Sequence, residues 1–195
     1  MSRPLHSFLS LTCLMILATA CGGYKETEVV DYRIYLDTND AGMLRETRRL
    51  VAYYNERMGS EALKVSPTRE GANSAIIWTK GLQAQDGKLG YGQWQTSTKQ
   101  DSQFVAITGK TPSRTVKYSM NIEFDQDFFI TRMTKAQTSP EWQELFVLFC
   151  HEVGHGLTMN HDEDPKSVMY KYIDGAAGIK FDEYFSRAKA FFASH

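Results

Sequence analysis

The sequence predicts one α+β domain, preceded by a short N-terminal segment outside the fold. Two stretches, residues 29–37 and 115–124, alternate apolar with polar side chains, as half-buried strands do. Residues 41–58 and 139–157 instead carry apolar side chains at helical spacing. With 195 residues, 42% of them hydrophobic, the chain is long enough and apolar enough to bury a core.

The first half of the domain is expected to contain a strand, a long helix and a second strand. The helix at 41–58 follows polar capping residues and ends at Gly59, because glycine readily takes the left-handed conformation that closes a helix. Residues 74–79 form a continuous apolar run, which predicts a strand buried on both faces. The strand at 29–37 has one apolar face, made by Val30, Tyr32, Ile34 and Leu36.

The second half is expected to contain a strand and two helices. Residues 86–94 are rich in glycine, and residues 103–108 are either a strand or part of a surface excursion. After the strand at 115–124, Ser139 is a suitable N-cap for a helix that is apolar around most of its circumference and therefore largely buried. Residues 181–195 predict a final amphipathic helix.

The N-terminus carries the features of an export signal. After Arg3, residues 8–20 form an uncharged apolar run that is too short to span a bilayer and suits the core of a secretory signal. The run ends in "LATAC", in which small residues precede Cys21, and this ending resembles a bacterial lipobox.

The lipobox resemblance implies a location and a domain layout. Residues 1–20 would be a lipoprotein signal peptide, Cys21 would carry a lipid, and residues 21–28 would tether the domain at 29–195 to the membrane. We therefore expect the protein in the bacterial cell envelope, lipid-anchored at the periplasmic face or the cell surface. The alternative is ordinary signal cleavage near Ala20, which gives a secreted protein with an idle thiol at position 21.

The cysteine positions argue against a disulfide within the domain, and the charge distribution argues against a nucleic-acid partner. Cys13 would leave with the signal and Cys21 would be lipidated, so Cys150 would be alone and no disulfide could form within the domain. Cys150 follows an apolar run and is expected to be a buried, inert thiol. The chain has 22 Lys and Arg against 23 Asp and Glu with no long block of one sign, so a nucleic-acid partner is not expected. We expect a monomer.

Three of the five histidines lie within residues 151–161. His151 and His155 are four residues apart on the predicted helix, so their imidazoles lie on one face and could bind one metal ion. Glu152 is turned about 100° from His151, so its carboxylate could reach a water on that metal rather than the metal itself. A catalytic zinc needs a third protein ligand and an open fourth position. His161 supplies the third ligand only if the chain leaves the helix and bends back.

At these residues the chain resembles the metzincin zinc endopeptidases. "HEVGHGLTMNHD" followed by "SVMY" is similar to their three-histidine motif and downstream Met-turn; "DPKSVMY" is similar to the matrixin branch, and Asp162 after the third histidine to the reprolysin branch. The resemblance implies a zincin fold with a twisted, mostly parallel sheet, a long helix, a buried active-site helix and a C-terminal helix. It also implies that "KLGYGQW", residues 88–94, is the strand beside the substrate cleft.

The same resemblance implies the roles of the site residues and the activity. His151, His155 and His161 would bind one catalytic zinc, Glu152 would be the general base, and Met169 would be an apolar floor beneath the metal. The expected activity is endoproteolysis of proteins or peptides outside the cytoplasm. Two alternatives stay open: a non-catalytic zinc-binding lipoprotein that acts as a binding module, and an interaction protein without metal.

One position departs from the metzincin pattern. Thr158 stands where the family usually has the glycine at which the backbone turns, and a β-branched residue is strained at positive φ. Asn160 could take the left-handed position instead. If the turn were altered, Asp162 or Glu183 could replace His161 as the third ligand.

Two further groups have more than one interpretation. Tyr170 and Tyr172 could reach a developing oxyanion, but packing is the expected role of both. The acidic residues at 125, 127 and 162–164 could hold calcium, but their spacing matches no calcium loop, so a calcium site is unsupported.

Overall fold

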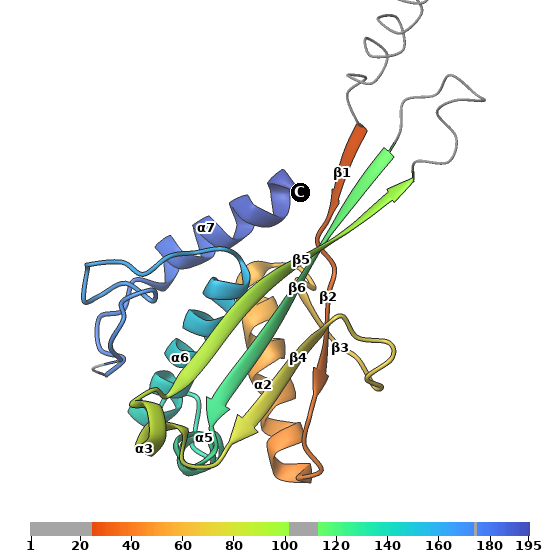
Figure 1. Cartoon of the computed structure of the whole chain (residues 1–195). Helices are drawn as coiled ribbons and strands as arrows, with labels where there is room; N and C mark the ends of the chain where they lie inside the picture. The colour runs from red at the N-terminus through yellow and green to blue at the C-terminus, as the bar shows by residue number, and fades with distance from the viewer. Residues whose placement is uncertain (1–24, 102–112, 174) are drawn as a thin grey trace, which may run out of the picture. The chain divides into compact units, whose positions relative to one another are not determined.

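The structure is a computed structural model that describes residues 25–101, 113–173 and 175–195 (Figure 1). The predicted signal, the lipid site at Cys21 and the predicted segment at 103–108 lie outside the described residues.

The chain divides into two compact units, one made of Met1–Thr27 with Thr98–Val116 and the other of Glu28–Ser97 with Lys117–His195. Within the smaller unit, the Arg114 guanidinium lies 3.6 Å from the Glu26 carboxylate. The histidine motif belongs to the larger unit.

The sheet is mostly parallel, as predicted. Its main path has the order β1-β6-β4-β2-β3; β2 pairs in parallel with β3 and β4, β4 pairs in parallel with β6, and β5 pairs with β6. In Figure 1, β5 runs opposite to β6, and no described strand pairs with its outer edge. The strands are β1 (Lys25–Val29), β2 (Tyr32–Leu36), β3 (Leu63–Val65), β4 (Ser74–Thr79), β5 (Gly90–Asp101) and β6 (Ser113–Asp125).

The two longest helices, α2 and α6, begin at the residues that the capping signals predict, and α2 also ends where predicted. Asp40 accepts a hydrogen bond from the Met43 N–H at the start of α2, and Gly59 closes that helix at φ 72°. Ser139 caps α6 in the same way, by accepting from the Trp142 N–H. None of the helices in the described ranges combines the length and apolarity of a transmembrane span. The helices are α2 (Ala41–Met58), α3 (Leu82–Asp86), α5 (Gln126–Met133), α6 (Pro140–Gly156) and α7 (Phe181–Ser194).

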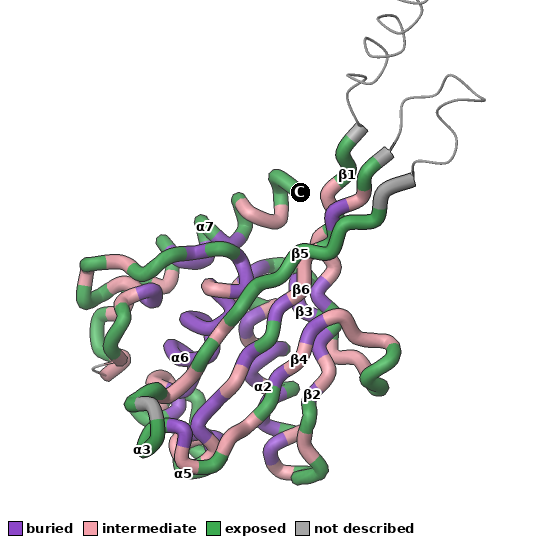
Figure 2. The backbone as a smooth tube through the Cα atoms, in the orientation of Figure 1, coloured by how far each residue is buried: buried purple, intermediate pink, exposed green. Residues whose placement is uncertain are grey.

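The core lies between the sheet and the helices packed against one of its faces. In Figure 2 the buried segments of α2 and α6 face buried positions on the strands. Tyr32, Ile34 and Leu36 of β2 are buried there, as their alternation predicts. Trp142 and Phe149 of α6 are fully enclosed in the same core. The ligand-bearing helix is therefore held on most sides by apolar contacts.

Several expectations about the elements were wrong. The run at 74–79 is buried on one face only, since Ile77 is 38% exposed on the face that no helix covers. The strand expected at 29–37 is interrupted between β1 and β2. By contrast, β5 begins at Gly90, within the stretch 88–94 that the metzincin resemblance placed as a strand beside the cleft. The short elements β3, α3 and α5 were not predicted, because elements of three to eight residues carry too few periods to show a pattern.

Asp125 joins the end of β6 to two helices. Its buried carboxylate accepts the Phe128 N–H at 2.8 Å, which caps α5, and the Gln83 N–H at 2.9 Å, which holds the first turn of α3. The Asp125 N–H donates to the Leu89 carbonyl at 2.9 Å. Asp125 therefore fixes the position of α3 and of the segment that leads from α3 into β5.

Replacing Asp125 with alanine should lower the free energy of unfolding by about 2 kcal/mol, because two buried N–H groups lose their acceptor. Chemical denaturation at saturating zinc would measure this change. Asp127→Ala is the matched control, since Asp127 is exposed in the first turn of α5 and should change stability by no more than about 0.5 kcal/mol. Equal effects of the two substitutions would contradict the role given to Asp125.

Candidate metal centre

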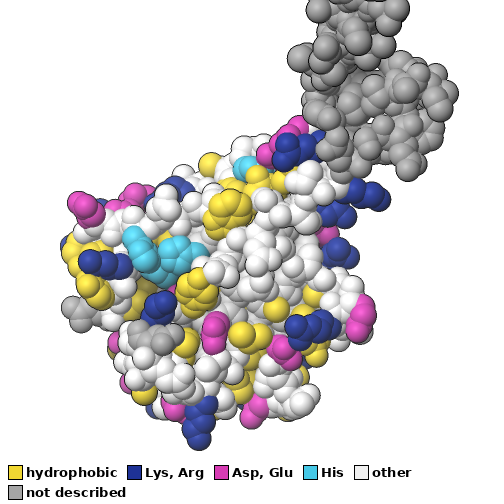
Figure 3. Space-filling view, viewed as in Figure 1, with side chains coloured by type: hydrophobic (Ala, Val, Ile, Leu, Met, Phe, Trp, Pro, Cys, Tyr) yellow, Lys and Arg dark blue, Asp and Glu magenta, His cyan; other side chains and the backbone are white. Residues whose placement is uncertain are grey.

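Three imidazoles converge at the surface of the larger unit. His151 and His155 lie on one face of α6, and His161 follows in the segment after the helix; one ligand nitrogen from each lies within 4.8 Å of the others. Figure 3 shows them as a single patch. His151 is buried, His155 is half-buried and His161 is exposed, so the cluster opens to solvent on the His161 side. The predicted meeting of these three residues is confirmed.

The bend after α6 is a helix-terminating Schellman turn. The Met159 N–H donates to the Gly154 carbonyl at 2.9 Å, and the Thr158 N–H donates to the His155 carbonyl at 3.0 Å. This pattern requires a left-handed residue between Leu157 and Met159. Thr158 takes that conformation at φ 64°, and no other non-glycine residue in the described ranges has a positive φ. The alternative that placed Asn160 in the left-handed position was therefore wrong.

The turn reverses the chain so that His161 faces the helix. Its ring centroid lies 5.2 Å from that of His151 and 4.8 Å from that of His155. The two alternative ligands lie outside the cluster. Asp162 accepts the Asp164 N–H and lies 3.8 Å from the Arg187 guanidinium, and Glu183 lies on α7. Among the described residues, the three histidines form the only group of His, Cys, Asp and Glu suited to a metal ion.

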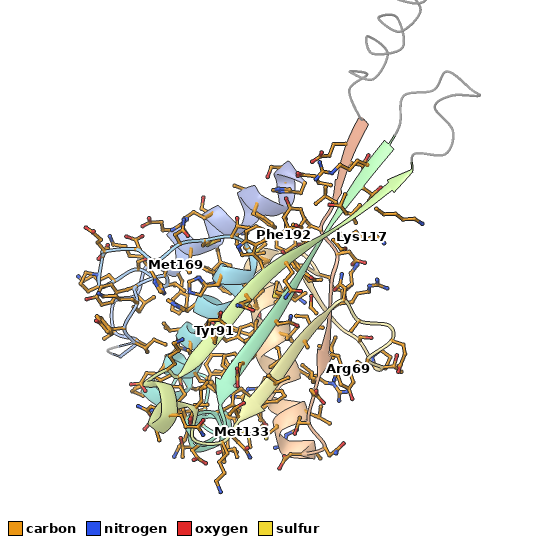
Figure 4. The ribbon with its side chains drawn as sticks, viewed as in Figure 1. Arg69, Tyr91, Lys117, Met133, Met169 and Phe192 are labelled. Carbon is orange, nitrogen blue, oxygen red and sulfur yellow. The ribbon has the colours of Figure 1, made fainter. Side chains whose placement is uncertain are left out.

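A second segment, the turn at 167–170, supports the helix from below. Met169 is fully buried, and a Cβ on Gly154 would collide with the Met169 sulfur, so the side chain lies directly against α6 between the two helical histidines. Figure 4 shows Met169 in the chain that follows α6. The turn is tied to the third histidine's segment, because the Asp162 N–H donates to the Met169 carbonyl at 2.9 Å.

The hydrogen bonds of the two helical histidines determine which nitrogen is free. His151 Nδ1 lies 2.8 Å from the Val168 carbonyl oxygen, and His155 Nδ1 lies 3.0 Å from the Met159 carbonyl oxygen. A carbonyl only accepts, so in each neutral ring Nδ1 carries the hydrogen and Nε2 carries a lone pair. The two Nε2 atoms are 3.1 Å apart. Two lone pairs at this distance repel unless a cation lies between them.

This donor set fits zinc. Burial lowers the pKa of His151 to about 4 and lowers that of His155 in the same direction, so both rings are neutral near pH 7. Neutral imidazole is a preferred zinc ligand, and a tetrahedral zinc holds its ligand nitrogens about 3.3 Å apart. Backbone carbonyls on the opposite ring nitrogen are the usual partners that orient such ligands. His161 would complete three protein ligands and leave the exposed side for a fourth.

Glu152 lies beside the cluster under two glycines of β5. A Cβ on Gly90 would be 2.6 Å from Glu152 Oε1, and a Cβ on Gly92 would be 3.0 Å from Oε2 and closer still to the Glu152 carbonyl oxygen. Burial raises the pKa of Glu152 to about 8, while a hydrogen bond from the Gly92 N–H and the charge of Lys88 lower it. The side chain is thus a buried carboxyl group next to three potential zinc ligands.

A cleft of about 630 Å³ lies over these residues. Its walls come from α3 and the segment before β5, from β5, from α6, and from residues 171–173 after Met169. Figure 4 shows Tyr91 on the β5 wall. Tyr172 is 61% exposed and contributes to the opposite wall, so it is not a packing residue as expected. The three histidines and Glu152 are accessible from this cleft.

The sequence profile of the matrixin family matches residues 84–183, just over half of the chain. The chain belongs to the matrixin family. The matched region contains all three histidines, Glu152 and Met169, and it also covers β5 and β6. No curated protein matches the chain. Matrixin membership identifies a metallopeptidase, and the three-histidine cluster agrees with zinc as its metal.

Sequence reasoning missed the residues that hold Glu152 and the histidine rings. Gly90 and Gly92 were visible as "GYG", but their role depends on how closely β5 approaches α6. The carbonyl groups of Met159 and Val168 are backbone atoms, so no side-chain motif in the sequence could predict that they orient the histidine rings. Cys150 is buried, and burial raises its thiol pKa, as expected for an inert cysteine.

Thr158→Gly should raise the free energy of unfolding by about 1 kcal/mol, because glycine takes the left-handed conformation without the Cβ strain that threonine bears. Thr158 is exposed, so little packing is lost. The expected rise in Tm is about 2–4 °C for a chain of this size. Thr158→Asn should give part of the gain, and a lower Tm in Thr158→Gly would contradict the strain assigned to this turn.

Gly92→Ala should reduce peptide hydrolysis on the order of 100-fold, because the added methyl group displaces the Glu152 carboxylate or the strand that covers it. Zinc content should stay at the wild-type level, because Gly92 does not contact the three nitrogens. Thr96→Ala, an exposed substitution on the same strand, should leave hydrolysis unchanged. Full activity in Gly92→Ala would show that β5 does not fix the position of Glu152.

Proposed function

We propose that the protein is a zinc-dependent endopeptidase that hydrolyses peptide bonds in proteins outside the cytoplasm. The observation that carries this proposal is the placement of a buried carboxyl group, Glu152, beside three converging histidines in an open cleft. A purely structural zinc site usually has a fourth protein ligand and no use for such a carboxylate. Matrixin membership supports the same reaction class.

Bound zinc would supply Lewis-acid chemistry, namely a more acidic water and a more polar scissile carbonyl. Glu152 takes one proton from the attacking water as the water oxygen bonds to the carbonyl carbon. The same carboxyl group then gives this proton to the amine nitrogen as the C–N bond breaks. The buried position of the carboxyl group beside the three histidines suits this role, because the group must carry the proton from the attacking water to the departing amine.

The substrate is proposed to bind in extended form along β5. The outer edge of this strand pairs with no other strand among the described residues, so its N–H and C=O groups can pair with a peptide backbone. The glycines at 90 and 92 let the strand lie directly over Glu152. A peptide on this edge would therefore pass the carboxyl group and the histidines at close range.

Met169 is proposed as the apolar floor of the zinc site. Its sulfur lies against Gly154, between the helical turns that carry His151 and His155. A buried thioether fills this space without offering a competing charge or a strong hydrogen bond. The turn therefore packs against α6 at Gly154 and would support the helix that carries His151 and His155 when they bind zinc.

The location of the enzyme is proposed from the N-terminal motif alone. A lipid on Cys21 and a short tether would hold the catalytic domain, residues 29–195, close to a membrane surface of the bacterial envelope. Such an anchor would direct proteolysis toward envelope or surface proteins. We propose that the enzyme acts as a monomer, since the cluster of ligands is complete within one chain.

Glu152→Ala should abolish casein cleavage, with a loss of at least about 100-fold, while retaining one zinc per chain. Metal analysis and a proteolysis assay on the same preparations measure both properties. A zinc chelator should abolish wild-type activity, and Glu56→Ala, an exposed substitution on α2, should leave activity unchanged.

The possible outcomes separate the alternatives. Cleavage by Glu152→Ala at the wild-type rate would refute the role of this residue. Stoichiometric zinc without any cleavage in the wild type would support the binding module instead. Stoichiometric zinc in the purified wild type would exclude the metal-free interaction protein.

A further inference from the structure

We propose that the cleft selects a substrate with an acidic side chain, preferably glutamate, at one of the two residues that flank the scissile bond. This inference rests on the proposed peptidase function and names the chemistry of its substrate. It depends on two lysines at the cleft, Lys88 and Lys171, which the matrixin resemblance does not assign to any role.

The cleft combines an apolar wall with two cationic groups. Leu89, Leu148 and Ile173 line it with aliphatic side chains, and Lys88 and Lys171 line it from opposite walls. Lys88 lies between α3 and β5, whereas Lys171 lies two residues after Met169. A side chain that contacts both kinds of group needs an aliphatic stem and an anionic end. Glutamate has both parts.

Aromatic rings hold both ammonium groups at the cleft. Lys88 Nζ lies 4.9 Å from the ring centroid of Tyr91, and Lys171 Nζ lies 4.8 Å from that of Tyr172. Both rings line the cleft themselves. These cation–π contacts favour lysine conformations in which the charge stays beside the cleft instead of extending into solvent.

No carboxylate among the described side chains forms an ion pair with either lysine, whereas Lys64 and Lys180 each lie within 3 Å of an aspartate. Among the described side chains that line the cleft, Glu152 is the one acidic group, and the proposed reaction already uses it. Figure 3 shows basic side chains bordering the histidine patch on two sides. The cleft therefore offers positive charge that a substrate carboxylate can pair with and that a substrate lysine would avoid.

The groove on the far side of His155 differs in charge. It is lined by Trp94, Thr158 and Asn160 together with other uncharged residues of β5, and none of the described residues in its wall is Lys, Arg, Asp or Glu. Trp94, 48% exposed, gives this side an aromatic surface. Because the two sides differ in this way, the acidic preference should apply to one flanking residue and not to both.

The test is a set of quenched fluorescent peptides that place Glu, Gln, Leu or Lys at each residue flanking one scissile bond, assayed with zinc-loaded enzyme. Glutamate and glutamine match in size, so the ratio of their kcat/KM values isolates charge. At one flanking position the wild type should prefer glutamate over glutamine roughly fivefold, as expected for two partly exposed charge pairs. Added salt should reduce this ratio.

The variant Lys88→Met/Lys171→Met should bring the glutamate-to-glutamine ratio to about one, and Lys88→Glu/Lys171→Glu should favour lysine peptides over glutamate peptides. Lys189→Met, an exposed substitution on α7 away from the cleft, should keep the wild-type ratio.

A wild-type ratio near one at both positions, with efficient cleavage, would overturn the acidic preference alone. A ratio unchanged in the double variants would overturn the role of these lysines. No cleavage of any peptide would overturn the proposed function and this inference together.

Discussion

Two ring nitrogens that both carry lone pairs face each other at 3.1 Å, and the rest of the site depends on this constraint. The rings cannot rotate away without breaking their Nδ1 hydrogen bonds to Met159 and Val168. Those carbonyls in turn belong to the two segments that the chain places after α6, the helix-ending turn and the turn at 167–170. A cation between the nitrogens would therefore stabilise both turns as well as the helix, so metal binding and folding of this region are coupled.

The close approach of β5 to α6 is the second organising feature. The strand can come this close only because β5 has no side chains at Gly90 and Gly92. The close approach encloses Glu152 between a strand and a buried helix. Enclosure raises the pKa of the carboxyl group, and it also leaves the outer edge of β5 free. One packing arrangement thus prepares a proton carrier and a surface on which an extended peptide could lie.

The sequence predicted both ends of α2 and the start of α6. The reason is that Asp40, Gly59 and Ser139 are capping residues with strong local preferences. It also predicted that His151, His155 and His161 would meet. It did not predict that Thr158 would itself take the left-handed conformation, since local preference favoured glycine or asparagine there and the closure of the site overrode it. The open face at Ile77, and the wall residues Lys88, Lys171 and Tyr172, depend on which segments come together in space. No local pattern encodes that.

The orientation of both helical imidazoles by main-chain oxygens has a consequence for how the site can change over time. Every amino acid has a carbonyl group, so exchanging the side chain at 159 or 168 removes neither acceptor. Centres that orient a ligand through an aspartate or glutamate can lose that contact in one mutational step. Here the contact persists as long as the course of the polypeptide does.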